Sequence, residues 1–177
     1  MKINLEKISL TILLLASMLW LGGSVIRAVI GFDLLQFGTL DFKPNIHPYV
    51  ERTVYAQIAQ STLVVDIAYI VVWIAGILYL KSTRLRLKDE GWLVMIAIFF
   101  YMFTPMEIYL MVLDTKIWLL DHIGSNDLVE FRILFIHRLA ALSGVPLIAT
   151  LCYYMGAVLA VFRPLRRSIP AGSIPTN

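Results

Sequence analysis

Long continuous apolar runs, separated by short groups of charged residues, dominate the pattern of this chain. Four runs are long enough for helices that cross a bilayer, because about 20 residues at about 1.5 Å each span the hydrocarbon core. A β-barrel would instead show short segments that alternate between apolar and polar positions. The pattern predicts an all-α integral membrane protein, a four-transmembrane-helix bundle with spans at 8–30, 55–80, 92–113 and 131–162. These spans form one membrane domain over 1–163, followed by a Pro/Ser-rich tail at 164–177.

Charged residues at the ends of the runs predict the orientation of the spans. Basic residues gather before the first span, between the second and third, and after the fourth, and these segments alternate with two connections that contain acidic residues. Positively charged segments stay in the cytoplasm, so both the N- and C-termini are expected to be cytoplasmic. The basic residues that define the three segments are Lys2, Lys7, Lys81, Arg84, Arg86, Lys88, Arg163, Arg166 and Arg167.

The composition agrees with a membrane protein and narrows its partners. The chain is 59% hydrophobic, whereas a soluble domain averages about 45–50% apolar. The net charge of +3 comes from residues at span ends, so it indicates topology and no nucleic acid partner. The single cysteine, Cys152, excludes a disulfide within the chain. Residues 1–24 resemble a signal peptide, but the apolar run continues through 25–30, so we expect a retained first span.

Both acidic connections are expected to be structured. The first, 31–52, is long for a link between helices and is interrupted by prolines. It is also rich in large apolar residues, so we expect it to lie on the membrane or on a partner. The second, 114–130, predicts a short interfacial helix around 117–120, followed by a turn at 124–127. The apolar residues of the first connection are Leu34, Leu35, Phe37, Leu40 and Phe42.

A group of polar residues is expected at similar depth in the outer half of the membrane. Ionisable groups there are costly, so they pair with one another, line water, or do both. Ion pairs that tie the helices together are one interpretation of this group. A pocket that handles protons or a quinone headgroup is a second, and contact with another subunit's charges is a third. His137 shares a helical face with Gly144, which points it at a neighbouring helix and not at lipid. The candidate residues are Arg27, Asp66, Glu107, His137 and Arg138.

Two prolines inside predicted spans indicate helix kinks. Pro105 has no N–H to donate to the carbonyl of Tyr101, and Pro146 stands in a similar position in the fourth span. Glu107 follows Pro105 by two residues, so a kink there would open the third span beside a carboxyl group. Such a group suits a proton carrier and equally suits a protonated carboxyl that makes a hydrogen bond.

Metal and haem sites have few candidate ligands in this sequence. His137 is the one histidine inside a predicted span, and Met102 or Met106 could supply a thioether ligand. No metal motif of known spacing is present, and methionines in such spans usually serve packing. Haem b and quinone therefore stay open as cofactors, and bound lipid is expected. No phosphate-binding loop or Ser–His–Asp order stands out.

These features predict an accessory, structural subunit of a larger membrane complex, such as a respiratory or other electron-transfer complex. We expect no catalysis by the chain alone, other membrane subunits as partners, and a multi-pass position in a prokaryotic inner membrane. The tail 164–177 would be ordered only on a partner subunit. The alternative is a protein with its own outer polar pocket: a quinone- or haem-binding redox module, or a small proton-coupled transporter. A membrane enzyme that uses Glu107 and Asp66 as acid and base is a third possibility.

Overall fold

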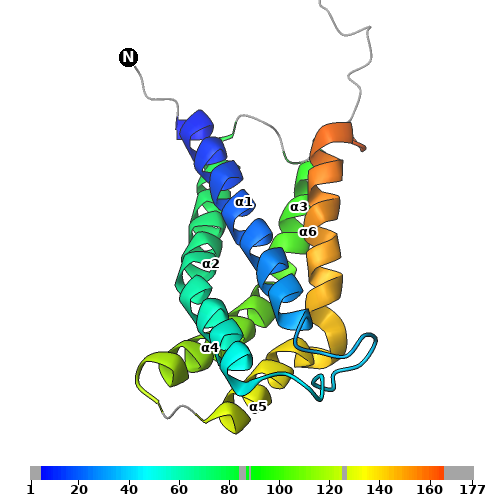
Figure 1. Ribbon diagram of the computed structural model, residues 1–177. Coiled ribbons are helices and arrows are strands. Elements are labelled where there is room, and N and C mark those ends of the chain that lie inside the picture. The colour runs from blue at the N-terminus through cyan, green and yellow to red at the C-terminus, as the bar shows by residue number, and fades with distance from the viewer. Residues whose placement is uncertain (1–4, 84–86, 88, 125–126, 166–177) are drawn as a thin grey trace, which may run out of the picture. The chain divides into compact units, whose positions relative to one another are not determined.

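The computed structural model describes residues 5–83, 87, 89–124 and 127–165, and most of this part of the chain is helical (Figure 1). Four segments are long and apolar enough to cross a membrane: α1, α2, α3 followed by α4, and α6. This confirms the predicted all-helical, multi-pass fold class (Figure 1). The helices are α1 (Leu5–Phe32), α2 (Pro48–Ser82), α3 (Gly91–Met102), α4 (Thr104–His122), α5 (Leu128–Leu139), the 3-10 helix η1 (Ala141–Gly144) and α6 (Val145–Phe162).

The chain folds as two compact units, one of residues 1–83 and 107–144 and the other of residues 84–106 and 145–177. In the first unit, α1 and α2 lie side by side along much of their length (Figure 1). Gly23 allows this approach, because a Cβ atom there would lie 2.7 Å from Cγ2 of Val65. Trp20 and Tyr69 are buried nearby, with ring centroids 5.1 Å apart. Small residues that bring backbones together are a typical packing device of membrane helices.

A second packing centre of the first unit joins the connection after α1 to α2, α4 and α5. Tyr55 stacks on Phe131 at 5.2 Å between ring centroids, and Phe135 meets the edge of the same tyrosine. Gly31 lies against Phe135, so α1 ends on this cluster. We call the cluster the loop core. It consists of Leu34, Leu35, Tyr55, Ile58, Ala59, Ile117, Leu120, Phe131 and Phe135.

The connection between α1 and α2 is folded back on itself. Leu35 and Phe42 form an isolated antiparallel bridge, and the turn between them contains Gly38 at φ +81°, a conformation that favours glycine. Leu34 and Leu35 enter the loop core, whereas Phe37 at the turn is fully exposed. The apolar residues of this connection thus divide between the chain's own core and its surface.

The second unit contains α3 packed on α6 (Figure 1). Gly156 faces Ile96, since a Cβ atom at this glycine would lie 3.7 Å from the isoleucine Cγ2, an ordinary packing distance. Tyr153 is buried between Phe100 and Phe103, with ring centroids about 6 Å from each. Small and aromatic side chains therefore supply this contact, as expected where lipid removes the hydrophobic driving force between helices.

The third segment differs from its predicted bounds of 92–113. Helix α4 continues to His122, so the region predicted as a separate interfacial helix belongs to α4. Ile117 and Leu120 are buried in the loop core. No glycine or proline interrupts the chain between 113 and Gly124, which explains the continuation. Ser125 and Asn126 of the predicted turn lie outside the described residues.

The fourth segment also differs from its predicted single helix at 131–162. Helix α5 ends at Leu139, and after η1 the chain resumes as α6 at Val145. Two residues with positive φ, Leu142 at 50° and Gly144 at 90°, interrupt the helical path. Helix α5 belongs to the first unit, and of the two helices α5 and α6 only α6 is a candidate span.

Both prolines stand at helix starts and do not bend continuous helices. Pro146 is the second residue of α6, and Pro105 is the second residue of α4, after the non-helical Phe103. Proline fits the first turn, where the missing N–H has no helical acceptor, and disfavours helix at the residue before it. The predicted kinks are thus helix breaks. The tail after Leu165 and the basic residues Lys2, Arg84, Arg86, Lys88, Arg166 and Arg167 lie outside the described residues.

Candidate functional site

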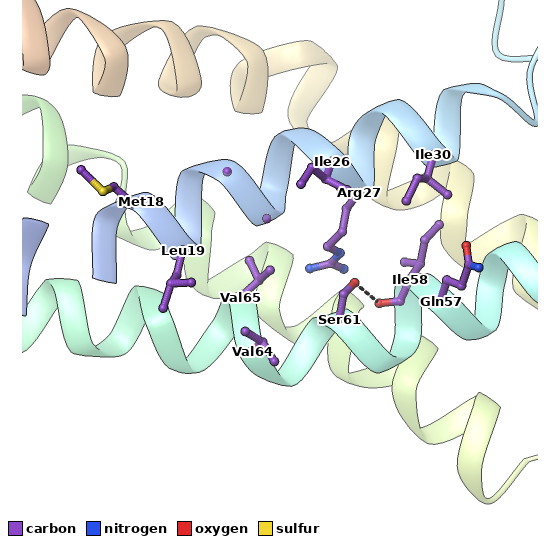
Figure 2. A pocket seen from close by; sticks show the side chains of 12 residues that line it. Met18, Leu19, Ile26, Arg27, Ile30, Gln57, Ile58, Ser61, Val64 and Val65 are labelled. Carbon is purple, nitrogen blue, oxygen red and sulfur yellow. Dashed lines mark hydrogen bonds between the residues drawn. The ribbon is translucent and has the colours of Figure 1, made fainter. Parts of the chain in front are cut away.

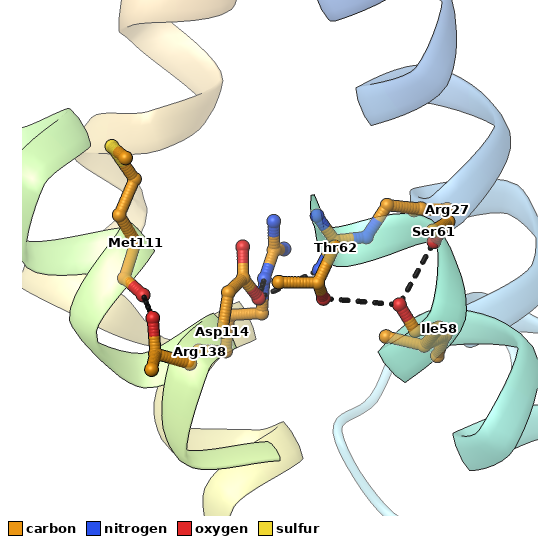
Figure 3. A network of polar contacts seen from close by, with 8 residues as sticks. Arg27, Ile58, Ser61, Thr62, Met111, Asp114 and Arg138 are labelled. Carbon is orange, nitrogen blue, oxygen red and sulfur yellow. Dashed lines mark hydrogen bonds and ion pairs between the residues drawn. The ribbon is translucent and has the colours of Figure 1, made fainter. Parts of the chain in front are cut away.

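A buried set of two ion pairs and a hydrogen bond joins α1, α2, α4 and α5 in the first unit (Figure 3). Nη2 of Arg27 donates to Oδ1 of Asp114 at 2.7 Å and to Oγ1 of Thr62 at 3.2 Å. Nε of Arg138 donates to the same carboxylate oxygen. The Arg27 and Asp114 side chains are each 3% exposed. We call these four residues the Asp114 cluster.

The Asp114 cluster holds more positive than negative charge, because two guanidinium groups share one carboxylate. Asp66 lies within electrostatic range of both arginines, and Glu107 within range of Arg138. Burial lowers the pKa of Arg138, but Asp114, with Asp66 and Glu107, raises it by more, so its pKa ends above the usual value. The arginine therefore stays charged, and the cluster works as a fixed electrostatic tie between helices.

The structure brings together some of the residues that the sequence analysis proposed. Arg27 and Arg138 meet through Asp114, with Asp66 and Glu107 within electrostatic range. His137, next to Arg138 on α5, instead has an exposed side chain. It makes no hydrogen bond or ion pair with another described residue. The prediction that His137 faces a neighbouring helix requires a helix that continues to Gly144, whereas α5 ends at Leu139.

Asp114, the centre of the cluster, is absent from the predicted site. The apolar pattern predicts a third span that ends at 113, which places Asp114 in the second connection. Glu107 and Asp114 are seven residues apart, a spacing that puts two side chains on one face of a helix. That spacing, together with the absence of a helix breaker before Gly124, is the signal for including Asp114.

A second buried carboxylate lies beside the loop core. Glu51 is 0% exposed, and its two oxygens accept from Nε and Nη2 of Arg132 at 2.6 Å each. The hydroxyl of Tyr55 donates to the same carboxylate at 3.0 Å. The hydrogen bond with Glu51 raises the pKa of Arg132 above its usual value. This bidentate pair fixes the start of α2 against α5.

An additional ion pair lies next to Glu51, at the start of α2. Nη1 of Arg52 lies 2.6 Å from Oδ1 of Asp121, which ties α2 to the end of α4. Glu51, Arg52 and Arg132 are not among the predicted site residues, because the sequence pattern extends the first connection to Arg52. The i, i+4 spacing of Glu51 and Tyr55 is the available signal that the helix has already begun.

The candidate haem and metal ligands are distributed over both compact units. Within the described residues, no group of three or more His, Cys, Asp or Glu side chains could hold a metal ion. Met102 is exposed and Met106 is buried, and both belong to the second unit, whereas His137 belongs to the first. Comparisons of this chain with protein-family models, with curated proteins and with solved structures find no match.

Proposed function

We propose that this chain is a structural, non-catalytic subunit of a larger membrane protein complex, of the respiratory or another electron-transfer type. The observation that carries the proposal is that the buried charged residues Arg27, Asp114 and Arg138 bind one another across three helices. Groups fixed in this way stiffen a bundle, whereas a catalytic acid or base must exchange protons with a substrate. The same holds for Glu51, which is enclosed by Arg132 and Tyr55.

Exposed apolar residues support a protein partner at one end of the first unit, which we call the loop end; it comprises the connection 33–47, the start of α2 and the end of α4. Phe37 is fully exposed at the turn of the first connection, and Leu40, Tyr49 and Ile123 are also exposed. Large apolar side chains gathered on loops are typical of an interaction surface. We propose that both termini are cytoplasmic and that this loop end faces the opposite side of a prokaryotic inner membrane.

Purification from native membranes in a mild detergent tests the proposal. We expect the chain to elute with other membrane subunits, at a mass well above its own 20.1 kDa. Phe37→Ser should release those subunits while leaving the thermal stability of the chain unchanged, because the Phe37 side chain is fully exposed. Glu130→Gln, which alters an exposed side chain of α5, is the matched control and should retain them. A wild-type chain that purifies as a stable monomer contradicts the proposal.

Asp66 favours a second candidate function, a small proton-coupled transporter with its own polar pocket. Its side chain is partly buried on α2, within electrostatic range of Arg27 and Arg138, and hydrogen-bonds to no described residue. A carboxyl placed so within a membrane segment suits proton exchange. In vesicles that enclose a pH-sensitive dye, Asp66→Asn should then abolish proton uptake, whereas the exposed control Asp33→Asn should not. Equal uptake in both variants removes this candidate.

A further inference from the structure

A groove of about 460 Å³ runs between α1 and α2, within the first unit (Figure 2). This volume falls within the range of about 300–1,000 Å³ that small-molecule sites occupy. The described residues that form its walls are mostly apolar and include no aromatic side chain. The lining residues on α1 are Met18, Leu19, Gly22, Gly23, Ile26, Arg27 and Ile30, and those on α2 are Gln57, Ile58, Ser61, Val64 and Val65.

Among the described residues that line this groove, Arg27 alone is charged. Its side chain extends from α1 toward Ser61 of α2, as Figure 2 shows. Nη2 is occupied by Asp114 and Thr62, but Nε and Nη1 are buried and have no hydrogen-bond partner within the described residues. Buried guanidinium N–H groups without acceptors are costly, so an acceptor oxygen from outside the chain is expected to fill this position.

We propose that the groove binds one phospholipid of the surrounding bilayer. An ester or phosphate oxygen of the lipid accepts hydrogen bonds from Nε and Nη1 of Arg27, and one acyl chain lies along the apolar walls toward Met18. A phosphate also offers negative charge to a cluster in which Arg27 and Arg138 share the carboxylate of Asp114. The inference stands whether the chain acts alone or within a complex.

The geometry of the groove suits an acyl chain. Twelve residues separate Met18 from Ile30, which corresponds to about 18 Å along the helix axis, roughly half of a bilayer's hydrocarbon core. Arg27 lies five residues before Phe32, the end of α1, so its long side chain is placed about 8 Å from that end. A polar head near the interface and a tail toward the midplane is the arrangement of a bilayer lipid.

Two further observations favour a lipid over a quinone or a partner helix. The rim residues Met18, Leu19, Ile26 and Val64 are exposed, so a chain can enter sideways from the bilayer. A flat quinone ring would gain from stacking on aromatic side chains, and the lining has none. At Gly22 a Cβ atom would meet nothing within 4 Å, so the groove is open beside this residue and can be filled by substitution there.

Native mass spectrometry of the purified protein, with any bound subunits, tests the proposal. The protein is first reconstituted in vesicles of palmitoyl-oleoyl phosphatidylglycerol and then extracted in a mild detergent. We expect one phosphatidylglycerol to remain bound through the detergent wash. Gly22→Phe should weaken this retention about tenfold or more by filling the groove, whereas Val29→Phe, on an exposed part of α1 outside the groove, should leave it unchanged. Val64→Phe fills the groove from α2 and replaces Gly22→Phe in the experiment if that variant does not fold.

A pair of conservative variants separates the headgroup contact from general damage to the cluster. Arg27→Lys keeps a positive charge near Asp114 but removes the Nε and Nη1 donors, so retention should fall about tenfold, as for a lost charge-assisted hydrogen bond. Arg138→Lys alters the same cluster but not the groove lining, and should retain the lipid. Equal lipid retention in Gly22→Phe and the wild type overturns the proposal. So does a groove that releases a quinone on organic extraction, or a Gly22→Phe variant that loses a subunit and keeps the lipid.

Discussion

Nη2 of Arg27 and Oδ1 of Asp114 lie 2.7 Å apart although 87 residues separate them in the sequence, and both side chains are 3% exposed. The first helix is thereby tied to the fourth at a point where neither group meets water. Because an isolated charge is so costly there, the two residues depend on each other for burial. The stability of the first unit should respond sharply to the loss of either one.

Asp114→Asn removes the negative charge that two buried arginines share. We expect it to destabilise the protein by about 3–5 kcal/mol, the usual cost of breaking a buried ion pair by removing one partner. The melting temperature Tm of the detergent-solubilised protein measures this loss. Asp33→Asn is the control, because its pair with Lys43 is exposed and should contribute about 0–1 kcal/mol.

Replacing Arg27, Asp114 and Arg138 together by leucine should cost much less than the single change, because no ionised member of the Asp114 cluster is then left without its partner. A triple variant that is less stable than Asp114→Asn would contradict the view that the arginines, once deprived of Asp114, cause the damage. Any lipid retention should be measured in parallel, since the triple variant also removes Arg27 from the groove.

Long apolar runs make the helical membrane fold predictable, because lipid leaves the backbone few alternatives. Helix ends are less predictable. The continuation of α4 from 113 to His122 also buries Ile117 and Leu120 in the loop core, a tertiary contact that the apolar pattern alone does not reveal. The same error removes Asp114 from the predicted site and leaves Arg27 and Arg138 without their common partner.

Asp114 is missing from the predicted site, whereas His137 is included although its side chain is exposed. His137 is grouped with the buried charges because it shares a helical face with Gly144 on an ideal helix. That periodicity no longer applies after Leu139, where the chain leaves the α-helix. A face drawn on a helical wheel has meaning only as far as the helix extends.

Arg132→Gln should destabilise the protein more than Glu51→Gln does. Removing Arg132 leaves a carboxylate that is 0% exposed without its bidentate partner, with an expected cost of about 3–5 kcal/mol. Removing the charge of Glu51 leaves an arginine whose side chain is 45% exposed and can reach water, with a cost of about 1–3 kcal/mol. Chemical denaturation in detergent measures both.

The double variant of Glu51 and Arg132 tests the interpretation. Its loss should be smaller than the sum of the two single losses, because the second substitution no longer breaks an intact pair. Strictly additive losses would mean that the two residues act separately, in spite of the two 2.6 Å hydrogen bonds between them.

Adjacent glycines on α1 should respond in opposite ways to alanine. Gly23→Ala places a Cβ atom 2.7 Å from Cγ2 of the stiff Val65, so it should destabilise the protein by about 1–3 kcal/mol. Gly22→Ala meets nothing within 4 Å and should stabilise the helix by up to about 1 kcal/mol. Thermal unfolding of the two variants compares them directly, and Val65→Ala should rescue Gly23→Ala.

Thiol labelling in cells tests the proposed orientation. In a Cys152→Ser background, Phe37→Cys should react with a membrane-impermeant maleimide in intact cells, because the side chain is fully exposed at the loop end. Lys81→Cys, exposed at the other end of α2, should react only after the membrane is permeabilised. The reverse pattern would place both termini outside the cytoplasm.

The length of α2 determines which solvent, water or lipid, competes with packing in the loop core. At 35 residues the helix is about 52 Å long, well beyond the hydrocarbon core of about 30 Å, and the charged Glu51 and Arg52 mark its Pro48 end. We therefore expect Tyr55, Phe131 and the buried leucines of the connection, which form part of the loop core, to assemble where water, and not lipid, is the competing solvent. Heat capacity should rise when this part melts, as it does for a soluble protein, while separation of α1 from α2 in lipid adds little. A scanning calorimetry trace of this small membrane protein would thus report mainly on the melting of the loop core.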